Sequence, residues 1–174
     1  MKNANRYFFP EYPMLWECEY WNMDPYAVEL NTYVDAILDV VFEYGADRQI
    51  TFHSFSPEIC ILTSLKQRQF PVLFANDSGN TPAGDPRAAN LQEAIQFAKR
   101  WNLSGLVMAS EPYVMCPRLL EFTKSSGIRC ATYGVLNDTP EGAKVITFFR
   151  SSITSTRDCF INRTPRQFPE THVC

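Results

Sequence analysis

Four short apolar runs recur along the chain, and each of the first three is followed by a segment with helical features. The runs read "QITFHSF", "PVLFAN", "SGLVMAS" and "IRCATYG", and they begin near residues 50, 71, 104 and 128. Their spacing of roughly 20 to 33 residues suits a strand followed by a crossover helix, which returns the chain to a parallel strand. The central runs are almost continuously apolar, as in strands that are covered on both faces. The sequence therefore predicts an α/β fold with a parallel sheet.

The segments beside these runs carry the signals of helices. Residues 26–44 place apolar side chains at helical spacing, with Asp24 and Pro25 as a start signal and Gly45 as a stop. We expect the next helix to run from residue 57 to about residue 66, because Ser56 is a favourable N-cap and Pro57 suits the first helical position. Two further helices are predicted from "LQEAIQFAKRW" and "PRLLEFTKSSG".

Charge and composition exclude several classes of function. The 174 residues carry a net charge of −3, and Lys and Arg are scattered, so we expect no nucleic-acid partner. No stretch reaches the ~18 apolar residues that a membrane span requires, and the opening residues lack the pattern of a secretory signal. The six cysteines include no C-x-x-C pair, which favours reduced thiols. Together these features predict a cytosolic protein.

Six motifs follow one another along the chain, namely "YPML", "DPYAVELNTYVDAIL", "SFSPEICILTSLKQ", "PVLFANDSG", "LQEAIQFAKRWNLSGLVMASE" and "ATYGVLND". In this order they resemble the glycerophosphodiester phosphodiesterase domain, and more narrowly that of the fungal glycerophosphocholine phosphodiesterases. The resemblance implies a TIM barrel of eight βα units with its active site at the carboxyl ends of the strands. This chain has about four units, so we expect a partial TIM barrel. Residues 12–144 would form the C-terminal half of the barrel, residues 1–11 an unassigned N-terminal segment, and residues 145–174 a divergent, poorly ordered tail.

The resemblance also implies a chemistry, for which this chain lacks the principal groups. Such enzymes hydrolyse glycerophosphocholine-type diesters to glycerol 3-phosphate and an alcohol, with a divalent metal such as Mg or Ca. Their His-Arg-Gly segment and second catalytic histidine come from the first half of the barrel, and no His-Arg-Gly occurs here. Aligned on "YPM", the metal-binding acid falls at Phe9 and the phosphate-binding lysine at Glu11. We therefore predict no catalytic residue, no metal ligand and no hydrolase activity for this chain alone.

Four residues are predicted to face a glycerophosphodiester substrate. Ser54 and Phe55 end the first predicted strand, where a capping hydroxyl and a core ring are the structural alternatives. Tyr133 takes the place of a tryptophan that lies against the glycerol in the family, and Asn137 closes the same loop, with a turn after a core aromatic as the alternative. His53 matches neither catalytic histidine of the family, and we interpret it as a hydrogen-bonded or solvated strand-end histidine.

Two other interpretations stay open. The chain could be a non-catalytic half-barrel that binds or assembles with another half, because an open parallel sheet has two uncovered edges that invite self-association. It could also be a small doubly wound ligand-binding domain, which would need a closed strand order that the missing units do not favour. Isolated acids such as Glu17, Glu19, Glu29 and Glu111 are expected to be solvated rather than to bind a cation.

Overall fold

The computed structural model describes residues 6–13, 18–19, 22, 27–45, 48–77, 79 and 84–140. These residues form one parallel sheet of five strands in the order β1-β2-β3-β4-β5, so each strand pairs with the next one along the chain. The strands are β1 (Arg6–Phe8), β2 (Ile50–Ser54), β3 (Val72–Asn76), β4 (Gly105–Ala109) and β5 (Arg129–Tyr133). A sequential order without a reversal is that of a barrel segment and not of a doubly wound sheet.

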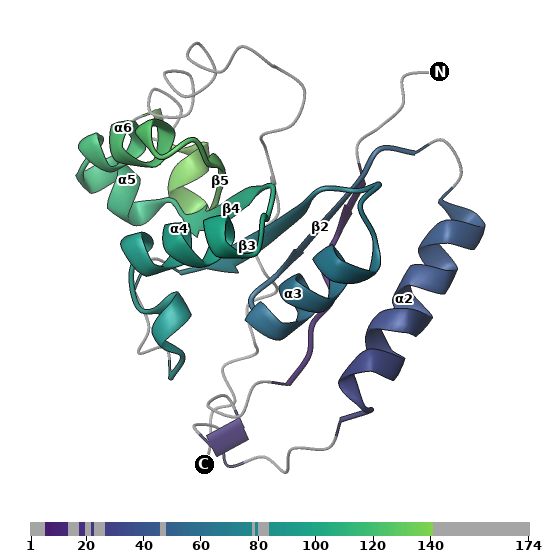
Figure 1. Cartoon of the computed structure of the whole chain (residues 1–174). Coiled ribbons are helices and arrows are strands. Elements are labelled where there is room, and N and C mark those ends of the chain that lie inside the picture. The colour runs from purple at the N-terminus through teal and green to yellow at the C-terminus, as the bar shows by residue number, and fades with distance from the viewer. Residues whose placement is uncertain are drawn as a thin grey trace, which may run out of the picture.

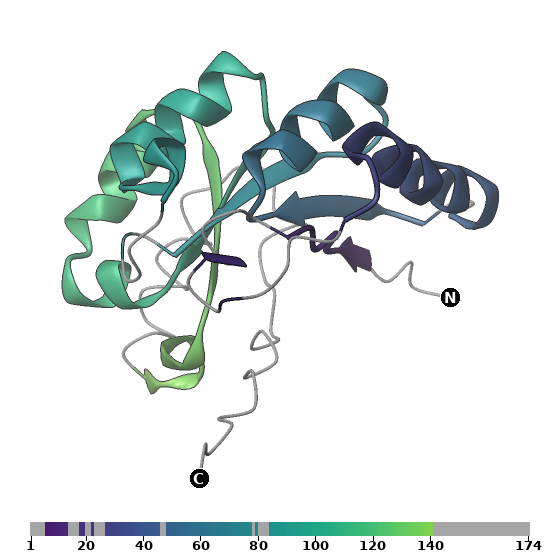
Figure 2. The ribbon, with the colours of Figure 1, turned by 90° about the horizontal axis from the view of Figure 1, so that it is seen from below.

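The helices cover one face of this sheet (Figures 1 and 2). They are α2 (Leu30–Tyr44), α3 (Pro57–Lys66), α4 (Leu91–Arg100), α5 (Glu111–Met115) and α6 (Arg118–Ser125), with two 3-10 turns, η1 (Pro86–Ala88) and η2 (Val135–Asp138). The predicted α/β fold and partial barrel are therefore confirmed. No helix within the described residues has both the length and the apolar character needed to cross a bilayer.

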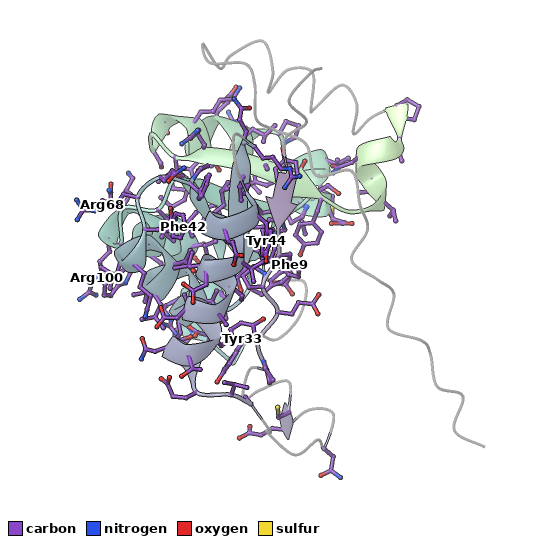
Figure 3. The ribbon with its side chains drawn as sticks, turned by 90° about the vertical axis from the view of Figure 1, so that its right-hand side faces the viewer. Phe9, Tyr33, Phe42, Tyr44, Arg68 and Arg100 are labelled. Carbon is purple, nitrogen blue, oxygen red and sulfur yellow. The ribbon has the colours of Figure 1, made fainter. Side chains whose placement is uncertain are left out.

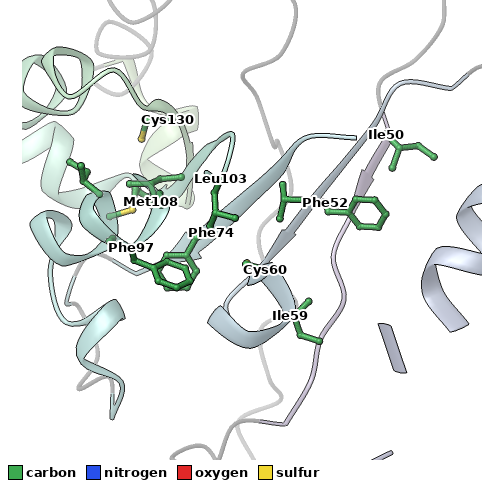
Figure 4. Packing of buried hydrophobic residues seen from close by; sticks show 14 of the residues in the cluster. Ile50, Phe52, Ile59, Cys60, Phe74, Phe97, Leu103, Met108 and Cys130 are labelled. Carbon is green, nitrogen blue, oxygen red and sulfur yellow. The ribbon is translucent and has the colours of Figure 1, made fainter. Parts of the chain in front are cut away.

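The main core lies between the sheet and the helices. Because side chains alternate along a strand, every second residue points to the helices, and Phe52, Phe74, Leu106 and Met108 are at most 1% exposed. Phe74 meets Phe97 of α4 edge to face, with ring centroids 4.9 Å apart. Figure 4 shows this layer of side chains under the helices. Burial of such large apolar side chains is the main stabilising term of the fold.

The helix ends agree with the sequence in one case and differ in another. Ser56 caps α3 through a hydrogen bond from the backbone N–H of Ile59, and Pro57 stands at the first helical position, as predicted. The helix expected over residues 26–44 begins only at Leu30, because the Glu29 carboxylate accepts hydrogen bonds from the N–H groups of Asn31 and Thr32. These bonds lower the pKa of Glu29 to about 2. Glu29 is thus a helix cap, and Asp24 and Pro25 lie outside the described residues.

Two tyrosine hydroxyls form hydrogen bonds between the segment after β1 and the region of α2, including the residues just before this helix. Tyr12 donates to the carbonyl oxygen of Val28 at 2.7 Å, and Tyr33 donates to that of Glu11 at 2.6 Å. Figure 3 shows Tyr33 on α2 and Phe9 beside β1 on the same side of the molecule. The N-terminal residues, which we expected to be unassigned, therefore add a first strand to the sheet and hold the chain that follows it.

One helix was not expected, and two expected features lie outside the described residues. The short helix α5, residues "EPYVM", precedes α6 and was not predicted, because its five residues are too few to show a period. The predicted tail, residues 145–174, and Glu17 lie outside the described residues.

Candidate functional site

The residues that follow the five strands gather at one edge of the sheet, which we call the carboxyl rim. In parallel strands all carboxyl ends lie at the same edge, the edge at which ligands bind in α/β folds. The rim is formed by Phe9 after β1, Phe55 after β2, Asp77 after β3, Ser110 and Glu111 after β4, and Tyr133 with Gly134 at the end of β5. Two of the four predicted site residues, Phe55 and Tyr133, belong to it.

Three aromatic rings meet at the carboxyl rim. Phe55 lies edge to face against Phe9, with centroids 5.7 Å apart, and against Tyr133, with centroids 5.9 Å apart. All three are half-buried and pack on small side chains of the face turned away from the helices, namely Ala75, Val107 and Ala131. The small residues leave room for the rings, which form an apolar surface directly beside the strand ends.

His53 lies beneath this aromatic cluster, on the face of the sheet turned away from the helices. Its ring stacks on Phe9 at 4.7 Å between centroids and stands edge-on to Tyr7 at 6.3 Å. The residue is 9% exposed, and among the residues that the structure describes no hydrogen-bond partner reaches Nδ1. Burial lowers the pKa of His53 to about 4, so the ring is neutral at physiological pH. The expected solvated histidine is thus largely buried, because Phe9 covers the ring, and a hydrogen bond at the other ring nitrogen stays a prediction.

Two carboxylates act electrostatically on the phenol of Tyr133. Burial raises the pKa of Tyr133, and the carboxylates of Asp77 and Glu111 raise it further, because a phenolate beside them would be repelled. The phenol therefore stays protonated over the whole physiological range. Two carboxylates from neighbouring strand ends thus act on one aromatic side chain of the carboxyl rim.

The loop that carries Asp77 is fixed at its far end. Arg87 pairs with Asp85 in the same loop and with Glu58 of α3 at 2.5 Å, and its guanidinium lies 5.7 Å from the ring centroid of Phe97. Asn76, the last residue of β3, donates from Nδ2 to the carbonyl oxygen of Ala88 at 2.9 Å. These contacts hold the β3–α4 connection against the helical layer.

The other two predicted site residues make backbone contacts. The buried Ser54 hydroxyl donates to the carbonyl oxygen of Pro10 at 2.9 Å and accepts from the N–H of Ser56 at 3.1 Å. Asn137 donates to the carbonyl oxygen of Thr132 at 3.0 Å and accepts from the Thr132 hydroxyl at 3.1 Å. Both side chains order the loops beside the carboxyl rim, and their contact with a substrate stays a prediction.

The part of the chain that the structure describes contains no cluster of ligands for a divalent metal. Hard cations require several oxygen ligands around one point. Among residues 6–13, 27–45, 48–77 and 84–140, together with the few other described positions, no group of three His, Cys, Asp or Glu side chains could hold one. Phe9, at the position that the resemblance gives to a metal-binding acid, instead stacks on His53.

Sequence reasoning missed Phe9, Asp77 and Ser110 as parts of this edge. The available signal was positional, since each of them directly follows a strand. The strand before Phe9 has only three residues and was not recognised, so the position of this ring could not be derived.

A comparison with family models matches residues 4–155 to the Glycerophosphoryl diester phosphodiesterase family. The match begins before residue 12 and includes β1. A glycerophosphocholine phosphodiesterase of Eremothecium gossypii is 48% identical over 135 residues, which is 78% of this chain and 10% of that protein. The corresponding protein of Schizosaccharomyces pombe is 48% identical over 128 residues, 74% of this chain and 11% of the relative. The chain therefore spans about a tenth of the length of these fungal relatives.

Solved structures agree on the fold. The crystal structure of a glycerophosphodiester phosphodiesterase from Parabacteroides distasonis superposes with a TM-score of 0.50 at 12% identity, and it is matched over 69% of this chain and 44% of its own. A Silicibacter pomeroyi protein gives a TM-score of 0.54 at 16% identity, over 69% of this chain and 38% of its own. At such low identity the likeness concerns the fold alone.

Proposed function

Because the chain belongs to the glycerophosphoryl diester phosphodiesterase family, we propose that its carboxyl rim forms one wall of a substrate site for glycerophosphocholine-type diesters. Hydrolysis at this site would yield glycerol 3-phosphate and an alcohol. The observation that carries the proposal is the meeting of Phe9, Phe55 and Tyr133 at the strand ends, with Asp77 and Glu111 beside them. Apolar rings with a few polar groups at this edge are typical of small-molecule sites in barrels.

Within this proposal the chain binds and orients, and other residues carry out the proton transfers. Diester cleavage needs two proton-transfer groups and a cation that neutralises the phosphate. His53 is neutral and stacked under Phe9, and the described residues hold no metal cluster. The divalent metal, Mg or Ca, and the catalytic histidines would therefore be supplied by the first units of a complete barrel, and the chain alone would be inactive.

An activity assay tests this division of labour. The purified chain is incubated with glycerophosphocholine and either magnesium or calcium, and choline release is measured beside the complete domain of the Eremothecium gossypii relative. We expect no release by the chain and the same result for His53→Ala. Release that needs metal and disappears in His53→Ala would contradict the proposal.

A second candidate function is that of a non-catalytic half-barrel for assembly. Within the described part of the chain, β1 and β5 each have one neighbouring strand, and Phe8 of β1 is 37% exposed. This function predicts self-association, which sedimentation velocity would detect as a dimer at micromolar concentration. A compact monomer under these conditions would exclude it. A cytosolic location stays our prediction from the sequence.

A further inference from the structure

Cations that are scattered along the sequence come together at the amino end of the sheet. The helices α3, α4 and α6 end there, and residues 63–72, 97–105 and 122–129 lead from them into the next strand. These three connections contain no Asp or Glu and six Lys or Arg, namely Lys66, Arg68, Lys99, Arg100, Lys124 and Arg129. Before β2, residues 42–49 add Arg48 and the acid Glu43, while Asp47 lies outside the described residues. We call the described residues of these four connections the basic end.

The connections of the basic end lie side by side, because the strands that follow them are parallel neighbours. The Ser64 hydroxyl donates to the carbonyl oxygen of Trp101 at 3.3 Å, which joins the end of α3 to the end of α4. Arg129 Nε donates to the carbonyl oxygen of Ser104 at 3.2 Å, which joins the connections before β4 and β5. The cations therefore share one surface.

Several of these cations are not neutralised. Arg68, Lys99 and Arg100 are exposed, and no carboxylate of the described residues pairs with them, whereas Lys66 binds Asp35 at 2.6 Å. Figure 3 shows Arg68 and Arg100 projecting on the same side of the molecule. The helix dipole favours cations in the last turn of a helix, but Arg68 lies beyond the last turn of α3. Capping of helices thus accounts for only part of the charge.

Exposed apolar side chains accompany the cations. At the end of α2, Phe42 is 50% exposed and Tyr44 is 62% exposed, and Leu65 in the last turn of α3 is 63% exposed. Cations alone would suit any polyanion, whereas large apolar side chains among them are typical of surfaces that enter the headgroup region of a bilayer. Tyrosine suits this place, because its ring can be buried while its hydroxyl stays in water. The composition of the basic end therefore favours a lipid surface.

The other end of the sheet has the opposite charge. Asp77 and Glu111 belong to the carboxyl rim, and Glu58 lies in the first turn of α3 on the same side. We propose that the basic end binds the surface of a bilayer that contains anionic lipids, with Tyr44 and Leu65 among the headgroups. The carboxyl rim then points away from the bilayer and stays open to water-soluble ligands. This inference goes beyond the proposed function and does not depend on it.

Co-sedimentation with vesicles tests the inference. The purified chain is mixed with vesicles of phosphatidylcholine alone, or of equal parts of phosphatidylcholine and phosphatidylserine, and the bound fraction is measured at low and at high salt. We expect binding to the anionic vesicles only, and weaker binding as salt rises, because salt screens exposed charges. Equal binding to both kinds of vesicle, or no binding to the anionic vesicles at low salt, would contradict the proposal.

Matched charge variants locate the surface. One cation near an anionic bilayer changes the affinity about fivefold, so Arg100→Gln should weaken binding by this factor, and its combination with Arg68→Gln by more than about tenfold. Arg118→Gln removes an exposed arginine at the end of α6 remote from the basic end, and it should bind as the unmodified chain does. Melting curves show whether each variant is folded. Equal losses in Arg100→Gln and Arg118→Gln would mean that only net charge matters, and the assigned surface would be wrong.

A matched apolar pair distinguishes a bilayer from other polyanions. Leu65→Gln changes an exposed apolar side chain of the basic end, and Val135→Gln changes one that is 61% exposed beside the carboxyl rim. We expect Leu65→Gln to weaken vesicle binding about fivefold and Val135→Gln to leave it unchanged. Duplex DNA should compete poorly with the vesicles. If DNA displaces the chain completely and Leu65→Gln binds vesicles unchanged, the basic end is a general polyanion site and the membrane proposal is wrong.

Discussion

The two faces of the sheet differ in how completely their side chains are satisfied. The face under the helices presents large apolar residues such as Phe74 and Met108, fully buried in one continuous cluster. The opposite face presents the small residues Ala75, Val107 and Ala131 and a stacked neutral histidine, whose Nδ1 has no hydrogen-bond partner among the described residues. Burial of apolar side chains explains the first face. The second face contains a buried polar atom without a hydrogen-bond partner among the described residues. Proteins retain such destabilising groups at functional sites, so the proposed function concerns this face.

Removal of a large side chain from the helix-covered face should have the greatest effect. Phe74→Ala takes a fully buried ring from between β3 and α4 and leaves a cavity, so we expect a loss of about 3 to 5 kcal/mol in the free energy of unfolding. Phe55→Ala, on the half-buried aromatic cluster, should cost clearly less. Urea denaturation of both variants measures the difference. Equal losses would mean that the two faces do not differ as described.

The buried histidine should make stability depend on pH. The pKa of His53 is about 4 in the folded chain and near 6.5 in the unfolded chain, so between these values only the unfolded chain binds the proton. Stability is therefore fully present above pH 6.5 and falls as pH decreases toward 4, by up to about 3 kcal/mol. Denaturation at several pH values should show this slope in the unmodified chain.

The matched variant for this prediction is His53→Leu, which fills a similar volume without a titrating group. Its stability should fall less between pH 6.5 and 4, since the histidine whose pKa burial lowers is gone. Parallel pH curves for the two proteins would show that His53 is solvated after all.

The smallest expected effect is a difference in stability between the loss of a helix cap, Asn90, and the loss of the Ser110 hydroxyl. Asn90 caps α4 by accepting a hydrogen bond from the N–H of Glu93 at 2.9 Å, so Asn90→Ala should cost about 1 kcal/mol. Ser110→Ala removes a buried atom that has no hydrogen-bond partner among the described residues, and we expect no loss or a gain of up to about 1 kcal/mol. Thermal unfolding of both variants measures the contrast. A clear loss for Ser110→Ala would reveal a partner of this hydroxyl.

The sequence predicted the fold better than the site, for physical reasons. The spacing of the apolar runs fixes β2 to β5 as parallel neighbours, and Ser56 with Pro57 predicts the start of α3 correctly. The start of α2 was displaced because a glutamate takes the capping role that aspartate, asparagine or serine usually fills. β1 has only three residues, too few for an alternating pattern to appear.

In the candidate site, position along a strand predicted Phe55 and Tyr133 at the carboxyl rim. It did not reveal that Ser54 and Asn137 bond to backbone atoms, because those partners are set by how the chain turns after β1 and β5.

The sequential strand order also bears on how the chain folds during synthesis. From β2 onward, each strand pairs with the strand that was made immediately before it, so no contact of the sheet waits for a distant segment. Each pairing closes a loop of about one βα unit, which costs less chain entropy than pairing with a more distant segment. During synthesis, one βα unit after another can therefore be added to an existing edge of the sheet.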